Sequence, residues 1–265
     1  MSTSKTVTVP EFAGRKGGEP IVMITAADYT LARLMDGTGA VDCLLVGDSL
    51  GTVVQGRATT LAVTLDQMIY HTEMVVRGTQ RALVVADMPF GSYHESIEQA
   101  IRNATRMMQA TGCTAVKLEG GLRFADTVKA LVECGIPVMG HVGLMPQTVH
   151  AMGGYKVQRN EQKILDDASA ITEAGAFGVV LECLPAELGK RVTEKIKVPT
   201  IGIGAGVHCD GQVLVGHDLL GLFDGHRPKF VRPYADLKEV VRDCVKRFSS
   251  DVKARSFPSS DESFR

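Results

Sequence analysis

Two hydrophobic patterns alternate along the chain. Short runs rich in apolar and β-branched residues recur, and longer segments with helical spacing of apolar residues separate them. The runs are nearly continuous in apolar residues, which is typical of strands buried on both faces of a parallel sheet. The predicted strands are Ile21–Thr25, Cys43–Val46, Ala82–Ala86, Ala115–Leu118, Val138–Gly140, Gly178–Leu181, Thr200–Ile203 and Val213–Val215.

Four of the separating segments carry apolar residues three and four positions apart, which predicts helices with one face packed on a sheet. These helices are Ser96–Ala110, Ala125–Cys134, Gln162–Ala174 and Ala186–Lys195. Gly112, Gly135 and Gly175 closely follow three of them, at the place where a left-handed residue commonly ends a helix.

The alternation of strands and helices predicts an α/β fold with a parallel sheet. Eight units favour closure into a single (β/α)8 TIM barrel, although a doubly wound sheet has the same local pattern. A chain of 265 residues suits one such domain. We therefore expect one barrel domain over residues 1–265, with a polar tail over 249–265 whose composition predicts mobility.

Charge and composition indicate which kinds of binding partner and which cellular location to expect. The formal net charge is -1, and without a basic stretch the chain is not expected to bind nucleic acid. No apolar signal segment begins the chain, and no run of about 18 apolar residues predicts a membrane span. The six cysteines form no CxxC pair, which favours reduced thiols in a cytoplasmic protein.

Ionisable residues follow or end five of the predicted strands. In a parallel barrel all these strand ends meet at one face, where catalytic residues lie. We therefore predict one site that contains four carboxylates, a lysine and a histidine. The residues are Asp48 with its neighbour Ser49, Asp87, Lys117, Glu119, His141 and Glu182.

Simpler explanations exist for each residue alone. An aspartate after a strand often caps the next helix, but Asp87 precedes Met88 and Pro89, where no helix starts at once. A single lysine is commonly solvated, yet Lys117 and Glu119 are two positions apart and project to the same side of a strand. A lone histidine is more often structural. The coincidence at five strand ends favours a functional origin.

Carboxylates that converge in a partly apolar site repel one another unless some are protonated or a cation neutralises them. Oxygen ligands favour Mg²⁺ or Mn²⁺ over zinc. Mg²⁺ typically takes one or two protein carboxylates and keeps waters that substrate oxygens can replace. The sequence therefore predicts a divalent cation as cofactor.

A glycine-rich stretch spans Gly202–Gly206 after the seventh predicted strand. Such a stretch can bind phosphate, but it lacks the GxGxxG pattern of dinucleotide sites. A tight turn at the barrel rim is the favoured interpretation.

Several segments at these strand ends resemble the ketopantoate hydroxymethyltransferase family. They are VGDSLGTVVQG at Val46–Gly56, VADMPFGSY at Val85–Tyr93, AVKLEGG at Ala115–Gly121, GHVGLMPQTVHAMGGYKVQ at Gly140–Gln158, LECLPAEL at Leu181–Leu188, IGIGAGVHCDGQVLV at Ile201–Val215 and FPSSDESF at Phe257–Phe264. The resemblance covers nearly the whole chain in the same order. Two departures are His150, where the family commonly has Asn, and Ala62, where Pro is common.

The resemblance implies a barrel of the phosphoenolpyruvate mutase/isocitrate lyase superfamily. It also implies an enzyme that transfers a hydroxymethyl group from 5,10-methylenetetrahydrofolate to 3-methyl-2-oxobutanoate, giving 2-dehydropantoate for pantothenate synthesis. A homo-oligomer, in the family a decamer, is implied as well.

Matching of motifs carries residue roles onto this chain. Asp48 and Asp87 become Mg²⁺ ligands, with Glu119 beside the metal, directly or through water. Asp48, Ser49, Asp87 and Lys117 become contacts of the 2-oxo acid, and Glu182 becomes the proton acceptor.

These residue types are suited to remove the C3 proton of a 2-oxo acid. A cation that binds the keto oxygen and a carboxylate oxygen acidifies the C3–H bond. Lys117 would bind the substrate carboxylate and Glu182 would accept the proton, with His141 as a second candidate for substrate binding or proton relay.

Three alternatives stay open at the level of sequence. A lyase on the same barrel would carry a cysteine in a KKCGH-like loop, where this chain has Gly143-Leu144-Met145-Pro146. A barrel that only binds a metabolite would not catalyse proton exchange. A phosphate-binding barrel would use Gly202–Gly206 without a metal.

Overall fold

The structure is a computed structural model that describes residues 5–225 and 227–264. The chain divides into two compact units, one that ends at Val215 and one that begins at Gly216. The first unit holds the barrel. The expectation of a single domain over the whole chain stays a prediction.

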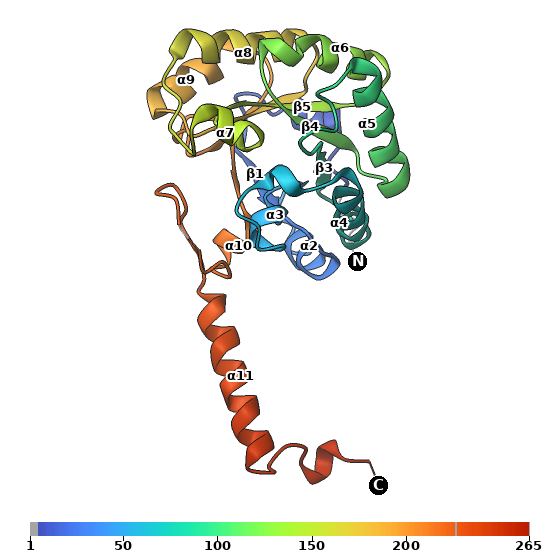
Figure 1. The fold of residues 1–265 in the computed structure, drawn as a ribbon, viewed down its shortest axis with the longest axis vertical. Helices are drawn as coiled ribbons and strands as arrows, with labels where there is room; N and C mark the ends of the chain where they lie inside the picture. Colours follow the sequence, from blue (N-terminus) through green and yellow to red (C-terminus); the bar gives the residue numbers. More distant parts are fainter. Residues whose placement is uncertain (1–4, 226, 265) are drawn as a thin grey trace. The chain divides into compact units, whose positions relative to one another are not determined.

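Eight parallel strands close into a barrel in the order of the sequence (Figure 1). They are β1 (Ile21–Thr25), β2 (Cys43–Val46), β3 (Leu83–Asp87), β4 (Ala115–Glu119), β5 (Val138–Gly143), β6 (Gly178–Glu182), β7 (Thr200–Ile203) and β8 (Gly211–Leu214). Strand β1 pairs with β8 from Ile21 opposite Gly211 to Ile24 opposite Leu214, which closes the sheet. The predicted TIM barrel is confirmed, and the doubly wound sheet is excluded.

Helices surround the barrel (Figure 1). They are α1 (Val9–Ala13), α2 (Tyr29–Asp36), α3 (Leu50–Val53), α4 (Leu65–Gly78), α5 (Ile97–Thr111), α6 (Ala125–Glu133), α7 (Val149–Met152), α8 (Glu161–Glu173) and α9 (Ala186–Lys195). Short 3-10 turns lie at Thr60–Ala62, Leu122–Phe124 and Pro146–Thr148.

The four predicted helices are confirmed to within a residue at their ends, and α5 shows why. The Ser96 side chain accepts a hydrogen bond from the backbone of Gln99 at the start of α5, which satisfies one of the unpaired N–H groups of the first turn. At the other end Gly112 has φ of 74°, a left-handed conformation that costs glycine little.

The interior of the barrel is filled by apolar side chains toward the starts of the strands. Members of this core include Met23, Leu45, Val85, Met139 and Val180. Successive side chains of a strand point to opposite faces, so a residue two positions beyond a core residue also points inward. This parity directs the last residues of β3, β4 and β6 into the same interior.

Helix α1 closes the barrel at the N-terminal ends of the strands. Phe12 is fully buried and meets Phe177 edge to face, with the ring centroids 5.5 Å apart. Nearby, Asp210 accepts hydrogen bonds from Lys16 Nζ at 2.9 Å and from the backbone of Thr200 at 2.8 Å. These contacts close the N-terminal end of the barrel.

The second unit contains α10 (Gly216–Leu219), α11 (Leu237–Lys253) and a 3-10 turn at Ser260–Glu262. Residues 249–253 of the predicted mobile tail therefore belong to a helix. The exposed large apolar residues of α11 are adjacent or lie three or four positions apart, a helical spacing that begins upstream of the tail and continues into it. They are Val240, Val241, Val245, Phe248 and Val252.

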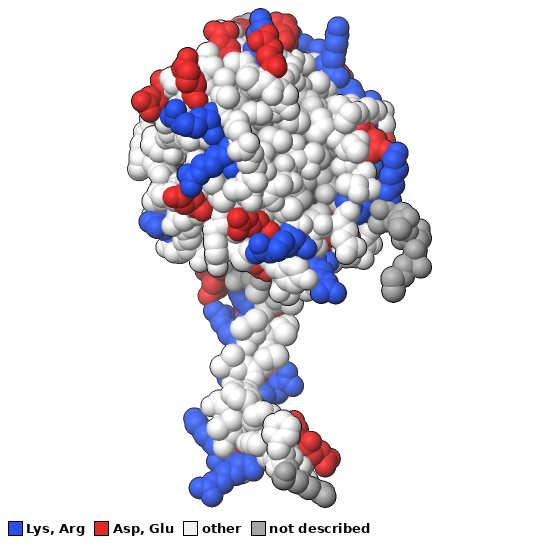
Figure 2. All heavy atoms as spheres, turned by 90° about the vertical axis from the view of Figure 1, so that its right-hand side faces the viewer, with Lys and Arg blue, Asp and Glu red and all other residues white. Residues whose placement is uncertain are grey.

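Figure 2 shows acidic and basic side chains mixed over the visible face of the barrel unit, around a broad area of uncharged residues. Within the part of the chain that the structure describes, no helix is long and apolar enough to cross a membrane. All six cysteines are free, and Cys134 and Cys244 are exposed rather than part of the core.

Candidate active site

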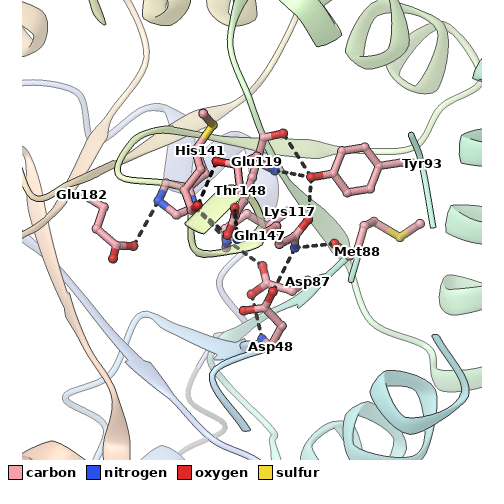
Figure 3. Close-up of polar contacts among 11 residues, drawn as sticks. Asp48, Asp87, Met88, Tyr93, Lys117, Glu119, His141, Gln147, Thr148 and Glu182 are labelled. Atoms are coloured by element: carbon pink, nitrogen blue, oxygen red, sulfur yellow. Dashed lines mark hydrogen bonds and ion pairs between the residues drawn. The ribbon is translucent and has the colours of Figure 1, made fainter. Parts of the chain in front are cut away.

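Strand register brings the predicted residues together at the C-terminal ends of the strands. Asp87 of β3 lies opposite Lys117 of β4, and Glu119 of β4 lies opposite His141 of β5. Glu182 ends β6, two positions beyond the residue that pairs with His141. Each of these residues lies an even number of positions from a core residue of its own strand, so its side chain points into the barrel. The barrel thus places them in one cluster (Figure 3).

Asp48 joins the cluster from the loop after β2. Its backbone N–H donates to Asp87 Oδ2 at 3.0 Å, so the loop is fixed by the carboxylate of the next strand. The other oxygen of Asp87, Oδ1, lies 2.8 Å from Lys117 Nζ. Ser49 follows at the start of α3 and is half-buried. Asp48, Asp87 and Lys117 thus form a connected group across three strands.

His141 connects this group to Glu182. Its Nδ1 lies 3.2 Å from Lys117 Nζ and 3.5 Å from Glu119 Oε1. Its Nε2 lies 3.1 Å from Glu182 Oε2. Burial and the nearby Lys117 oppose protonation, but the two carboxylates outweigh them and raise the pKa of His141 to about 9.

The carboxyl groups differ in their surroundings. Burial, together with Asp87 and Glu119, raises the pKa of Asp48 well above its ordinary value. Burial also raises the pKa of Asp87, although Lys117 opposes the shift. The pKa of Glu119 is lowered despite its burial, because His141 and Lys117 stabilise the charged form. Asp48 is thus the carboxylate that most lacks a compensating positive charge.

The cluster fits a divalent cation in its chemistry. Three buried carboxylates, those of Asp48, Asp87 and Glu119, face one lysine and one histidine, which leaves negative charge that a cation would balance. Within the described residues, no three His, Cys, Asp or Glu side chains are already arranged around a common metal position. Asp48, Asp87 and Glu119 each have one oxygen that accepts a hydrogen bond. This arrangement suits Mg²⁺, which needs only one or two protein carboxylates.

Two residues that the sequence analysis did not select complete the site. The Gln147 side chain donates from Nε2 to Asp48 Oδ2 at 2.9 Å, and its backbone N–H donates to Glu119 Oε2 at 3.0 Å. The Tyr93 hydroxyl donates to Gln147 Oε1 at 2.8 Å. Both residues lie inside the family-like segments, but their side chains are not ionised, so a search for charged strand ends missed them.

The glycine-rich stretch after β7 is confirmed as a turn. Gly204 and Gly206 have positive φ angles of 63° and 88°. A Cβ on Gly206 would come within 2.6 Å of the Ala186 Cβ at the start of α9, so the close approach of two backbones explains the glycine. No helix begins directly after the turn, and the phosphate interpretation loses its main physical basis.

The fold and the cluster define a class of protein. A closed (β/α)8 barrel with ionisable side chains gathered at the C-terminal strand ends is an enzyme architecture, and its acidic, partly neutralised site suits a metal-chelating anion.

Comparison with known proteins identifies the family. The model of the family "Ketopantoate hydroxymethyltransferase" matches residues 6–260. A 3-methyl-2-oxobutanoate hydroxymethyltransferase of Paracoccus denitrificans is 54% identical over 258 residues, with 96% of this chain and 93% of that protein covered. One of Syntrophomonas wolfei is 53% identical, with 94% and 92% covered. The chain belongs to the ketopantoate hydroxymethyltransferase family and is a one-carbon group transferase.

Solved structures with much lower sequence identity share the fold. A phosphonopyruvate hydrolase complex with oxalate and Mg²⁺ superposes with a TM-score of 0.64 at 12% identity, covering 96% of this chain and 93% of that one. A 2,3-dimethylmalate lyase of the PEP mutase/isocitrate lyase superfamily superposes with a TM-score of 0.63 at 16% identity, covering 97% and 88%. These structures show that the barrel fold of this chain is shared with members of that superfamily.

Proposed function

We propose that the enzyme transfers a hydroxymethyl group from 5,10-methylenetetrahydrofolate to 3-methyl-2-oxobutanoate, giving 2-dehydropantoate for pantothenate synthesis. The observation that carries the proposal is the connected cluster of Asp48, Asp87, Lys117, His141 and Glu182. Asp48 and Asp87 are suited to bind a cation, and Lys117 is suited to bind the carboxylate of a substrate. Glu182 places a further carboxylate at the edge of the site. Relatives above 50% identity carry the name of this reaction.

Asp48 and Asp87 would hold Mg²⁺, with Glu119 beside it, directly or through water; Mn²⁺ or another divalent ion would satisfy the same oxygens. The bound cation supplies Lewis acidity toward the keto oxygen of the substrate. The residues themselves supply a preformed cluster of acidic groups. Because Asp48, Asp87 and Glu119 are each at most 4% exposed to solvent, few water molecules compete for their carboxylate oxygens.

Lys117 and Ser49 would bind the 2-oxo acid together with the two aspartates. The Lys117 ammonium lies between Asp87 and His141, so its position is fixed before substrate arrives. Burial opposes its charge, but Asp87, Glu119 and Asp48 raise its pKa. Lys117 therefore stays positive and is suited to hold a carboxylate.

Glu182 would accept the C3 proton. Its side chain is 16% exposed, whereas those of Glu119 and His141 are 3% exposed. It is thus the carboxylate of the cluster that is most open to a substrate. His141 Nε2 lies 3.1 Å from Oε2 of the same carboxylate group, which leaves Glu182 Oε1 for the proton. The substrate enolate formed in this way would make a C–C bond to the methylene carbon of 5,10-methylenetetrahydrofolate. Over the whole reaction one water supplies the hydroxyl group of that carbon, both of its bonds to folate nitrogens break, and tetrahydrofolate leaves.

The test is exchange of the C3 hydrogen of 3-methyl-2-oxobutanoate for deuterium, followed by NMR with and without Mg²⁺. We expect exchange that needs both the enzyme and the cation, even without folate. A barrel that only binds the acid would bind without exchange. Absence of metal-dependent exchange would overturn the proposal.

The same proposal includes a cytoplasmic homo-oligomer, a decamer by analogy with the family. Light scattering after size-exclusion chromatography measures its mass, and fractionation of cells measures its location. A monomer in solution would contradict the oligomer.

A further inference from the structure

Gln147 contacts two of the three acidic residues proposed for the metal. Its side-chain Nε2 donates to Asp48 Oδ2 at 2.9 Å and to the Met88 carbonyl at 3.0 Å. Its backbone N–H donates to Glu119 Oε2 at 3.0 Å. One residue on the loop after β5 therefore fixes a carboxylate from the β2 loop relative to a carboxylate from β4.

The orientation of the Gln147 amide is set by its partners. Both hydrogens of Nε2 have acceptors, and Oε1 accepts from the Tyr93 hydroxyl at 2.8 Å. A reversed amide would place its carbonyl oxygen against two acceptors, Asp48 and the Met88 carbonyl. The residue is 3% exposed, so no solvent could compensate for those lost hydrogen bonds.

Tyr93 holds Gln147 in turn. The backbone N–H of Glu119 donates to the Tyr93 hydroxyl at 3.2 Å. The Tyr93 ring meets Phe124 edge to face at 5.2 Å between centroids, and the residue is 1% exposed. Tyr93, Gln147 and Glu119 therefore form a small closed network that packing keeps in one arrangement (Figure 3).

An amide has an advantage over a charged residue at this position. A lysine or arginine next to Asp48 would neutralise the carboxylate and reduce its attraction for a cation. The neutral amide fixes the rotation of the Asp48 carboxylate through a hydrogen bond and leaves its charge in place. The arrangement is that of an outer residue that orients a metal ligand.

We propose that Gln147, locked by Tyr93, is a positioning residue that holds Asp48 and Glu119 in the geometry that binds the divalent cation. This inference rests on the metal site of the proposed function. It assigns no chemical step to Gln147 itself, because its hydrogen-bonding groups are all used by the protein.

The experiment measures the dissociation constant of Mn²⁺ with the full chain, from the free Mn²⁺ signal in electron paramagnetic resonance. Gln147→Met keeps the length and removes the amide, and we expect it to weaken Mn²⁺ binding about 10–100-fold, the usual effect of losing an outer partner of a ligand. Tyr93→Phe should weaken binding in the same direction and by less. Gln162→Met is the matched control, because Gln162 donates to the carboxylate of Asp166 on the exposed face of α8.

A second readout separates positioning from a general structural role. In Gln147→Met, the Mg²⁺ concentration for half-maximal C3 exchange should rise by about the same 10–100-fold, while the exchange rate at saturating Mg²⁺ recovers to near that of the unsubstituted enzyme. A residue needed only for folding would instead lower the rate at every Mg²⁺ concentration and leave the half-maximal concentration unchanged.

Unchanged Mn²⁺ affinity in Gln147→Met would overturn the inference. If circular dichroism shows that this variant does not fold, Tyr93→Phe decides, and unchanged affinity there overturns the inference equally. If Gln147→Met weakens Mn²⁺ binding as expected but the unsubstituted enzyme shows no C3 exchange, the inference about Gln147 holds and the proposed reaction is rejected. C3 exchange in the unsubstituted enzyme, together with unchanged Mn²⁺ affinity in Gln147→Met, would support the proposed reaction and reject the inference about Gln147.

Discussion

His141 Nε2 lies 3.1 Å from Glu182 Oε2, and this contact connects the edge of the site to its interior. The same imidazole faces Glu119 through Nδ1 at 3.5 Å. One imidazole ring thus contacts an inner carboxylate near the proposed metal and an outer carboxylate near the proposed substrate. This division explains how acids of the same type within one cluster can have different tasks.

Replacement of Glu182 by Gln removes the proposed proton acceptor and keeps a side chain of the same shape. We expect C3 exchange to fall about 10²–10⁴-fold, the usual effect of losing a general base. Binding of Mn²⁺ and of the 2-oxo acid should change little. Deuterium incorporation by NMR and Mn²⁺ titration measure the two effects. Glu187→Gln, at an exposed position of α9, is the control, and full exchange in Glu182→Gln would remove Glu182 from this role.

Replacement of Asp87 by Asn should weaken cation binding. The carboxylate loses its charge, and Lys117, which lies 2.8 Å from Oδ1, then contributes a positive charge that repels the metal. We expect a loss of Mg²⁺ affinity of at least about 10-fold by isothermal titration calorimetry. Asp166→Asn, on the exposed face of α8, should titrate like the unsubstituted enzyme. An unchanged titration in Asp87→Asn would count against its role as a ligand.

The strands and the site were predictable from sequence for related reasons. Continuous apolar runs specify buried parallel strands, and a polar residue at the end of such a run stands out. Three predicted strands, however, ended one residue too early, at Ala86, Leu118 and Leu181. The backbone hydrogen bonds of β3, β4 and β6 continue through Asp87, Glu119 and Glu182, because the ladder does not depend on side-chain polarity.

The neutral members of the site could not be predicted in this way. Tyr93 and Gln147 come from loops, and their partners are distant in sequence. The two residues themselves have a sequence separation of 54. Only a folded barrel brings such groups into hydrogen-bonding distance. The helical part of the tail was missed for another reason, since α11 is specified by residues before Ser249 as well as after it.

Asp210 allows a prediction about pH at the closed end of the barrel. Burial opposes its ionisation, but hydrogen bonds from Thr200, Lys16 and Gly17 outweigh burial and lower its pKa. A carboxylate with a lowered folded-state pKa stabilises the protein above its unfolded pKa, about 3.9, and this contribution is lost as pH falls through the folded value.

We therefore expect Asp210→Asn to lower the free energy of unfolding by about 1.5–3 kcal/mol at pH 7, the range for hydrogen bonds to a charged group. The difference from the unsubstituted enzyme should shrink as pH falls below about 4. Urea denaturation at several pH values measures it. Asp66→Asn, which breaks an exposed pair with Arg106, should cost at most about 1 kcal/mol. A pH-independent difference for Asp210→Asn would contradict the electrostatic cause.

Gly143 at the end of β5 should be needed for the position of Glu182. It has φ of 104°, and a Cβ there would come within 2.3 Å of the Glu182 carbonyl oxygen. Gly143→Ala must therefore move the end of β6 away from β5, which separates Glu182 from His141. Asp48, in the loop after β2, and Asp87, on β3, lie on neither of these strands. A displacement near 1 Å can reduce a rate about 10²-fold.

We expect Gly143→Ala to lower C3 exchange by about that factor and to weaken Mn²⁺ binding less than Gln147→Met does, because the three nearest atoms that a Cβ at Gly143 would meet all belong to Glu182. Gly154→Ala is a matched control, since Gly154 also has a positive φ, 109°, but a Cβ there meets no atom within 4 Å. Exchange should therefore depend on the contact with β6 and not on backbone strain alone. If the two variants lost exchange equally, the strain of a left-handed alanine would explain the effect and the link from Gly143 to Glu182 would fail.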